Sequence, residues 1–480
     1  MLIFAICTNA AAEDAGRFQW FTVPIEVRGL PRGAEFQVVS VRVDFTAWLA
    51  ELQFKGLIDE RAVRLAAIAP DGSKTFQSVQ FLPDPQPRAK QRELLPGTGN
   101  NVSYLAEYGP GVAPSHLAQA GELAWIVRPP KSNDVGSGGL SGAHRFELEF
   151  GSPLDGSLVQ VPFPPQNVRG FDPAAKATAV ADFPRVQIHP QWAFDRQIEV
   201  EDLGKLVFGY HLGPDLRDAA PSLRRPFFYP LIGPDGVPLT EFGKPHDPTG
   251  SHAHHYSLWV AHALVNGKDF WSEKGGTIAH ENFELMEDGP VFSRIIERNR
   301  WRDGGKDLLR ERRTITVFQS QEPFRLIEIE IELTPASSTA VTFGKTSFGF
   351  LAARVAQSMT VFDGGGEIVN ANGKRNEQQA HLQRAAWLDQ SGPIAPGKWG
   401  GVALFDSPAN PNFPTVWHCR NDGWAGASFN AEQESTLRPG ETLRLRYGIL
   451  LHSGNASVVQ RRYAEFSARP EVAFEKPRKK

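Results

Sequence analysis

The chain has 480 residues and a formal net charge of −3 at neutral pH. This length exceeds that of one ordinary domain, so we expect two domains, each with its own core. The nearly neutral charge and the scattered basic residues argue against a nucleic-acid backbone as partner. No segment reaches the roughly 18 apolar residues of a membrane span, so we expect no spanning helix.

The first residues, MLIFAICTNAAAED, join a short apolar run to Ala10, Ala11 and Ala12. Small residues after an apolar run are typical of a secretory cleavage site, although the usual positive start is missing. We therefore expect residues 1–12 to be a signal peptide and the protein to be secreted or periplasmic. Cys419 is then the only cysteine left, and we expect it to be a small buried hydrophobe rather than a nucleophile.

The composition predicts an all-β protein. The chain contains 45 Gly and 37 Pro, too many for a helical bundle, and its 32 Phe and 11 Trp suit short strands. Strand-like runs fill residues 17–151, which we interpret as an N-terminal β-sandwich module with one helical insertion at FTAWLAEL. The periodicity is lost in residues 152–183, which we interpret as a linker.

The β pattern returns in residues 184–467, which we predict to be the catalytic domain. In the run FRLIEIEIEL, Glu328, Glu330 and Glu332 alternate with apolar residues and are expected on a solvated sheet face. The stretch NASVVQRRYAEF predicts a packing helix near the end. Residues 468–480 are expected to be a solvated tail.

The stretch GSHAHHYSLWVAHALVNGKDFW, residues 250–271, concentrates histidines around two tryptophans. If it is a strand, His252 and His254 share one face and His255 lies on the other. The pair His252 and His254 is then a candidate ligand pair for a divalent metal. Proton transfer and a purely structural role are the alternatives, and the spacing alone leaves all three open.

The surroundings of these histidines favour a carbohydrate as the partner. Imidazoles titrate near neutral pH, and aromatic rings stack on the apolar faces of sugar rings. Amides, carboxylates and cations bind sugar hydroxyls. The candidates for substrate binding in and around the stretch are Trp259, His262, Asn266 and Trp271, and the later tryptophan-rich blocks add Arg354, Lys374, Trp387 and Arg420.

An ordered series of blocks resembles the bacterial family called "methane oxygenase PmoA-like". The resemblance covers about residues 184–465 and includes the blocks RRPFFYPLIGPDGVPLT, HAHHYSLWVAHALVNGKDFW, WLDQSGP and ALFDSPANPNFPTVWHCRNDG. It implies a secreted protein that accompanies sugar-degrading enzymes, with a large galactose-mutarotase-like β-supersandwich after the N-terminal module. The oxygenase in the name does not suit a chain without a membrane-length apolar run.

Two motifs carry this resemblance, and both depart from the family pattern. In the pattern D-H-P-H-H-R-G-L-W the three histidines match, but Tyr256 replaces the arginine and Ser257 the glycine. In the pattern W-H-x-R-D-x-G, Asn421 replaces the aspartate and Asp422 follows it. The loss of the arginine puts anion recognition in doubt, whereas the carboxylate is displaced by one residue.

We therefore predict an exported carbohydrate-active enzyme that cleaves a glycosidic bond, by hydrolysis or by β-elimination. Either reaction needs a proton donor at the leaving oxygen and a base. His254 or His255 is the predicted acid or base, with Glu273 or His418 as its partner. A non-catalytic carbohydrate-binding protein is the alternative, and a metal-dependent oxygenase is the third hypothesis.

Overall fold

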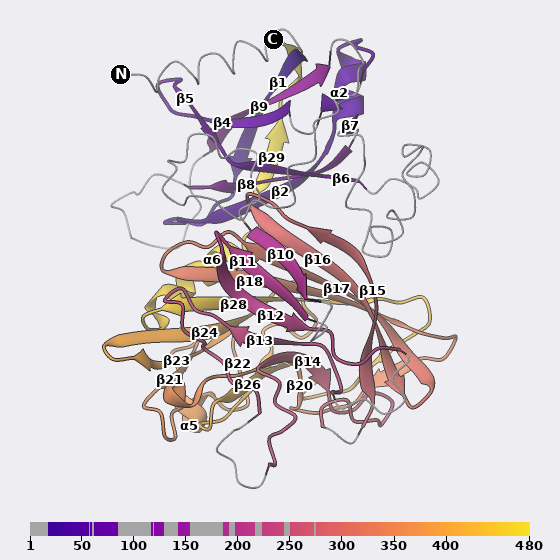
Figure 1. The fold of residues 1–480 in the computed structure, drawn as a ribbon, viewed down its shortest axis with the longest axis vertical. Coiled ribbons are helices and arrows are strands. Elements are labelled where there is room, and N and C mark those ends of the chain that lie inside the picture. The colour runs from indigo at the N-terminus through magenta and orange to yellow at the C-terminus, as the bar shows by residue number, and fades with distance from the viewer. Residues whose placement is uncertain are drawn as a thin grey trace. The chain divides into compact units, whose positions relative to one another are not determined.

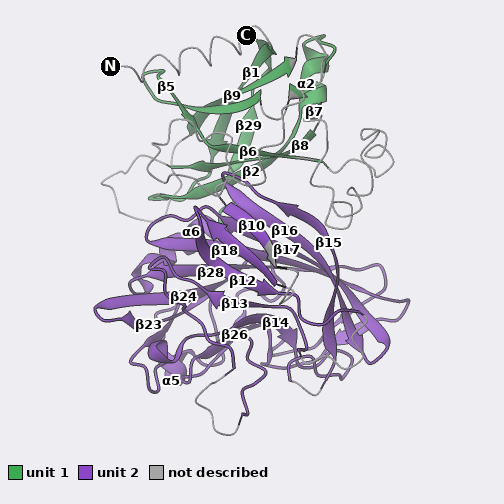
Figure 2. Cartoon of the chain, in the orientation of Figure 1, with its two compact units in different colours: residues 1–105, 110–184, 468–480 green, residues 106–109, 185–467 purple. Residues whose placement is uncertain are grey.

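The computed structural model of the chain (Figure 1) describes residues 18–56, 58–59, 62–84, 117–118, 120–128, 143–153, 186–191, 197–216, 223–243, 250–272 and 275–480. The chain divides into two compact units (Figure 2). Unit 1 holds residues 1–105, 110–184 and 468–480, and unit 2 holds residues 106–109 and 185–467. The expected signal peptide, nearly all of the expected linker, and Glu273 lie outside the described residues.

Unit 1 is a small β-sandwich. Its described residues form a sheet in the order β29(Glu471–Phe474), β1(Phe18–Arg28), β9(His144–Pro153), β4(Val63–Ile68) and β5(Lys74–Gln77), with β30(Arg478–Lys479) also paired to β1. A second sheet contains β2(Gln37–Asp44), β8(Ala120–Val127) and β6(Val79–Pro83), and β3(Ile58–Asp59) pairs with β7(Leu117–Ala118). The predicted helical insertion is α2(Phe45–Glu51), capped by Asp44, whose carboxylate accepts a hydrogen bond from Ala47 N.

The end of the chain is not the solvated tail that we expected. Residues 471–474 and 478–479 are strands β29 and β30, and both pair antiparallel with β1. Val472 and Phe474 pack against the core cluster of unit 1. The last residues therefore complete the sheet that the first described strand begins.

Unit 2 is a larger sandwich of two antiparallel sheets. In its described residues, the first sheet has nine strands, in the order β10(Val186–Gln191), β11(Gln197–Asp202), β12(Lys205–His211), β13(Phe227–Leu231), β14(Leu258–His262), β20(Gly349–Arg354), β26(Trp424–Ser428), β25(Val416–Cys419) and β22(Gln383–Arg384). The second has eight, in the order β15(Thr277–Glu287), β16(Phe292–Asp303), β17(Lys306–Phe318), β18(Phe324–Pro335), β28(Leu443–Ser453), β24(Lys398–Asp406), β23(Trp387–Ala395) and β21(Glu367–Asn370).

The two sheets of unit 2 enclose one core. Leu258 and Val260 of β14 belong to the same buried cluster as Ile327 and Ile329 of β18 in the other sheet. A shared core of this kind is what two sheets packed face to face produce. The all-β prediction is therefore confirmed.

Short elements complete unit 2: β19(Val341–Phe343) pairs with β27(Ser435–Leu437), and the helices are η3(Gln357–Met359), α5(Asn376–Ala380), η4(Ala456–Val458) and α6(Val459–Ser467). None of the helices among the described residues has the length and apolarity to cross a membrane. The acidic row of β18 is only partly solvated, because Glu328 and Glu332 pair with Arg446 and Arg444 of the neighbouring strand β28.

Candidate functional site

One face of the nine-stranded sheet points into the core of unit 2, and its opposite face, here called the outer face, carries most of the candidate residues. Trp259 lies between Leu258 and Val260, which both belong to the core, so its ring points away from that core. The same alternation places Arg354, Trp424 and His418 on the outer face, because their strand neighbours Ala353, Ala425, Trp417 and Cys419 belong to the core.

The first three histidines lie on a turn, not on the strand that we expected. Residues 251–254 form the turn, and His255 N donates to His252 O at 3.0 Å. The turn brings the rings together, with the centroids of His252 and His254 lying 5.1 and 4.5 Å from that of His255. A strand would have sent His255 to the other face, whereas the turn makes one group of three imidazoles.

Arg354 fixes the innermost member of this group. Its side chain is 0% exposed, and Nε donates to His255 Nδ1 at 2.8 Å. Nη1 donates to Asp422 O at 2.7 Å, and Nη2 donates to Asp422 Oδ2 at 3.3 Å. Because a guanidinium only donates, His255 Nδ1 holds its lone pair and Nε2 carries the proton. Burial, reinforced by the charge of Arg354, lowers the pKa of His255 well below its usual value.

The other two histidines are more accessible. His252 Nε2 lies 3.7 Å from Asp422 Oδ2, so an imidazole and a carboxylate face each other. Burial, with a smaller contribution from the charge of Arg225, lowers the pKa of His254 to about 4. Arg225 is buried, donates to His254 O at 3.2 Å and Trp271 O at 2.6 Å, and so ties the turn to the next loop.

The ring of Trp424 lies between His255 and a second group of histidines. Its ring centroid lies 5.4 Å from that of His255 and 4.2 Å from that of His418. Trp271 contacts the same ring at 5.5 Å, and Phe348 stacks on it at 6.1 Å. Phe348 is 42% exposed, so this aromatic surface reaches solvent.

The second group consists of His418 and His381, whose ring centroids are 4.7 Å apart. His418 Nδ1 lies 3.3 Å from Ser347 O, and His381 Nδ1 lies 3.0 Å from Cys419 O. A carbonyl only accepts, so His381 Nδ1 carries a proton, whereas His418 Nδ1 also lies 3.1 Å from the hydroxyl of Ser347, which can either donate or accept. Burial, followed by the charge of His381, lowers the pKa of His418 to about 4. Cys419 itself is buried, and burial raises the pKa of its thiol to about 12.

His262 does not join the site. It lies on the core side of β14, between the rings of Phe343 and Phe429 at 5.5 and 5.8 Å. Its Nε2 lies 3.1 Å from Gly344 O, and burial lowers its pKa to about 4. The predicted role in substrate binding is replaced by one in core packing.

Asn266 and Trp387 also have structural partners away from the histidines. Asn266 Oδ1 accepts a hydrogen bond from Thr342 N at 2.8 Å, which ties its turn to β19. Trp387 belongs to the eight-stranded sheet, and its Nε1 donates to Gln460 Oε1 in α6 at 3.1 Å.

Arg420 and Lys374, the two cationic side chains near α5 that were predicted to bind substrate, differ in their contacts. Arg420 Nε lies 3.0 Å from Glu377 Oε1, and that carboxylate also accepts from Asn421 N at 2.9 Å. Asn421, which stands at the aspartate of the family pattern, returns the contact by accepting from Glu377 N at 3.0 Å. Lys374 is exposed in the loop between β21 and α5.

Comparison with known proteins gives one family for unit 2. Residues 197–464 match the family described as "Family of unknown function (DUF6807)". The chain belongs to this family. No curated protein sequence is significantly similar to the chain.

Two solved structures resemble part of this DUF6807 chain. The match to a heparan sulfate lyase mutant from Pedobacter heparinus has a TM-score of 0.27 and 8% identity, and covers 57% of this chain and 36% of that one. The match to a putative kojibiose phosphorylase from the human microbiome has a TM-score of 0.26 and 8% identity, and covers 56% and 29%. The chain thus spans about a third of each protein, and similarities of this size do not indicate a shared activity.

The DUF6807 site contains residues that the sequence did not single out. Phe348 and Arg225 were missed because nothing local marks a lone residue whose partners lie far away in sequence. Trp424 could have been found: Asn421, Asp422 and Gly423 are strong turn formers, and the hairpin that they join brings the Trp424 ring to 4.2 Å from that of His418.

The described part of the DUF6807 domain does not bring together enough ligands for a metal ion. Within the described residues, no three His, Cys, Asp or Glu side chains are grouped to hold a metal ion. The predicted ligand pair has other contacts: His252 Nδ1 lies 3.0 Å from Ser251 Oγ, and the His254 ring packs on His255.

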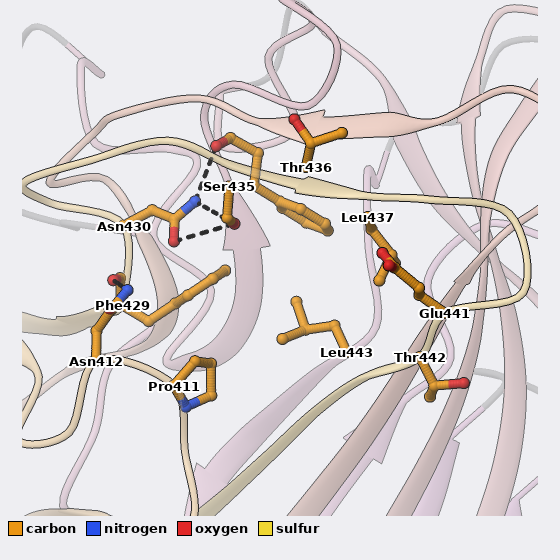
Figure 3. A pocket seen from close by; sticks show the side chains of 11 residues that line it. Pro411, Asn412, Phe429, Asn430, Ser435, Thr436, Leu437, Glu441, Thr442 and Leu443 are labelled. Atoms are coloured by element: carbon orange, nitrogen blue, oxygen red, sulfur yellow. Dashed lines mark hydrogen bonds between the residues drawn. The ribbon is translucent and has the colours of Figure 1, made fainter.

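A pocket of about 430 Å³ lies apart from these histidines (Figure 3). Its walls include the rings of Phe343 and Phe429, and Asn430 at its edge donates to Ser435 Oγ at 3.0 Å and to Phe343 O at 2.8 Å. The carboxylate of Glu441 accepts from Arg438 N at 2.7 Å. These polar groups therefore bond to the protein itself.

Proposed function

We propose that unit 2 is a carbohydrate-active enzyme that cleaves a glycosidic bond by imidazole acid–base chemistry on its outer face. One observation carries the proposal. His252 faces the carboxylate of Asp422 at 3.7 Å, and His254, whose pKa is lowered to about 4, packs on the same His255 ring. A protonatable group with a carboxylate partner thus adjoins a neutral base.

The two imidazoles divide the proton transfers. His254 is unprotonated at neutral pH and removes a proton, either from water or from an acidic C–H group of the sugar. His252 is the donor, because its Nε2 lies 3.7 Å from the carboxylate of Asp422. In hydrolysis the water oxygen bonds to the anomeric carbon as the C–O bond breaks; in elimination a C=C bond forms instead. In both, the proton from His252 goes to the leaving oxygen.

The aromatic surface supports a sugar as the substrate. The ring of Phe348, which is 42% exposed and stacks on the buried ring of Trp424, offers an apolar face for the C–H groups of a pyranose. Arg354, which we expected to bind substrate, is instead a positioning residue, because its three donors hold His255 and Asp422. Export of the enzyme remains part of the proposal, as does the relation to the PmoA-like family.

A screen on plant and algal polysaccharides, including 3-keto and uronic derivatives, tests the proposal, with and without a chelator. His252→Ala and His254→Ala are each expected to reduce kcat by about 10²- to 10⁴-fold while sugar binding persists. The matched control is His189→Ala, which removes a histidine of β10 whose side chain is 42% exposed. An unsaturated product identifies elimination.

Two results would count against this enzyme. Undiminished turnover in both variants would remove the histidines from the chemistry. Sugar binding without turnover of any substrate would favour the alternative, a carbohydrate-binding protein that uses the aromatic surface alone.

A further inference from the structure

Phe362 is the most exposed large apolar side chain among the described residues, at 79%. It lies in the turn of residues 361–364 that follows η3. A single exposed apolar residue is ordinary on a protein surface. Phe362 differs from such a residue in the way its loop is held and in what lies beside it.

The loop that carries Phe362 is fixed by its own hydrogen bonds. Thr360 Oγ1 donates to Asp363 Oδ1 at 2.5 Å, and Gln357 Nε2 donates to Asp363 Oδ2 at 2.9 Å. The backbone N of Gly366 donates to Thr360 O at 2.9 Å. The ring is therefore presented to solvent by an ordered turn and not by a loose one.

Two glycines make this tight turn possible. A Cβ on Gly364 would lie 2.1 Å from Gln357 O, and one on Gly366 would lie 2.0 Å from Met359 O. Any side chain at either position would push the loop away from η3. Gly364 and Gly366 are thus needed to hold Phe362 where it is.

Phe362 adjoins the candidate site through its backbone. Its N donates to Asn421 O at 2.9 Å, and the next residue, Asp422, carries the carboxylate that faces His252. On the other side of Asn421 lies Arg420, whose side chain is 50% exposed and pairs with Glu377. The backbone that carries the exposed Phe362 ring is thus bonded to the segment that carries Arg420 and Asp422, and the partner of Arg420, Glu377, is 29% exposed.

We infer that Phe362 forms a second sugar subsite, so that the enzyme takes an oligosaccharide or polysaccharide rather than a single sugar unit. This inference rests on the proposed function. A sugar ring that extends beyond the histidines stacks on Phe362, and Arg420 and Glu377 bind its hydroxyls. The subsite adds affinity only for chains long enough to reach it.

The test uses native gels that contain xyloglucan, arabinoxylan, galactomannan, mixed-linkage β-glucan or homogalacturonan, run with the full chain. Calorimetry then measures affinity for oligosaccharides of increasing length made from the polysaccharide that retards the protein. Phe362→Ala is expected to weaken binding of the long oligosaccharides about tenfold and to leave the shortest unchanged. Phe362→Trp should keep the affinity.

The matched control is Phe76→Ala, which removes a phenylalanine of unit 1 that is 58% exposed. Equal binding of long oligosaccharides by Phe362→Ala and the unchanged protein would overturn the subsite, as would a protein that none of the polysaccharides retards. Turnover is measured separately. Length-dependent binding that Phe362→Ala abolishes, without any turnover, would uphold the subsite and overturn the proposed chemistry.

Discussion

Replacing His262 by leucine is expected to remove part of the acid sensitivity of unit 2. His262 is 1% exposed, and its Nε2 lies 3.1 Å from Gly344 O. Burial lowers its pKa from 6.5 to about 4. The folded protein thus keeps the imidazole neutral at a pH where the unfolded chain protonates it.

The sign and size of the effect follow from proton linkage. Between about pH 6.5 and pH 4 the unfolded state binds a proton that the folded state does not, so the free energy of unfolding decreases as the pH falls. For His262 the loss is about 2 kcal/mol at pH 5 and about 3 kcal/mol below pH 4. That is a large share of the roughly 5–15 kcal/mol by which proteins are stable.

Urea unfolding followed by tryptophan fluorescence at pH 7 and pH 5 measures this difference. His262→Leu is expected to lose about 2 kcal/mol less than the unchanged protein between the two pH values. At pH 7 its stability should change by about 1 kcal/mol, the value of one hydrogen bond. His189→Ala is the control for removal of a solvent-accessible histidine. An unchanged pH dependence in His262→Leu, or a large loss of sugar binding, would refute the assignment of His262 to the core.

Two further predictions concern the outer face. Arg354→Met should lower the free energy of unfolding by about 3–5 kcal/mol, because it leaves the buried acceptor of His255 and the half-buried acceptors of Asp422 without their donor; a loss below about 1 kcal/mol in urea unfolding would contradict this. If His254 is the base, kcat/KM should fall as the pH drops through about 4, measured where fluorescence shows folded protein; an acid limb near pH 6.5 that His254→Ala leaves in place would point to another group.

The fold could be predicted as far as local patterns determine it. Alternation marks the strands, and α2 has the cap that its sequence suggests. The final strands could not be recognised in this way, because β29 is defined by its partner. The pairing of Ile25 with Phe474 joins the two ends of the described chain, and nothing in the local composition of residues 468–480 indicates it.

The sequence indicated several of the residue types that the structure groups on the outer face, but not their geometry. The histidine stretch reads as a strand, yet Ser257 adopts a φ of 61°, in the left-handed region that favours the glycine of the family pattern. This conformation ends the turn before β14 begins. The carboxylate that is displaced by one residue was anticipated more closely, because Asp422 does face His252. The side chain of Asn421 instead accepts a hydrogen bond from Glu377 N.

The three adjacent imidazoles have different roles in the proposed chemistry. The hydrogen bond from Arg354 distinguishes His255 from the other two. The Arg354 guanidinium stays charged and donates to His255 Nδ1, so that nitrogen does not bind a proton. His255 is therefore a buried, neutral residue against which the other two rings pack. The rings of His252 and His254 pack against the ring of His255. A double replacement of His254 and His255 would therefore mix loss of packing with loss of chemistry, and only single replacements of His252 and His254 separate a catalytic role from a structural one.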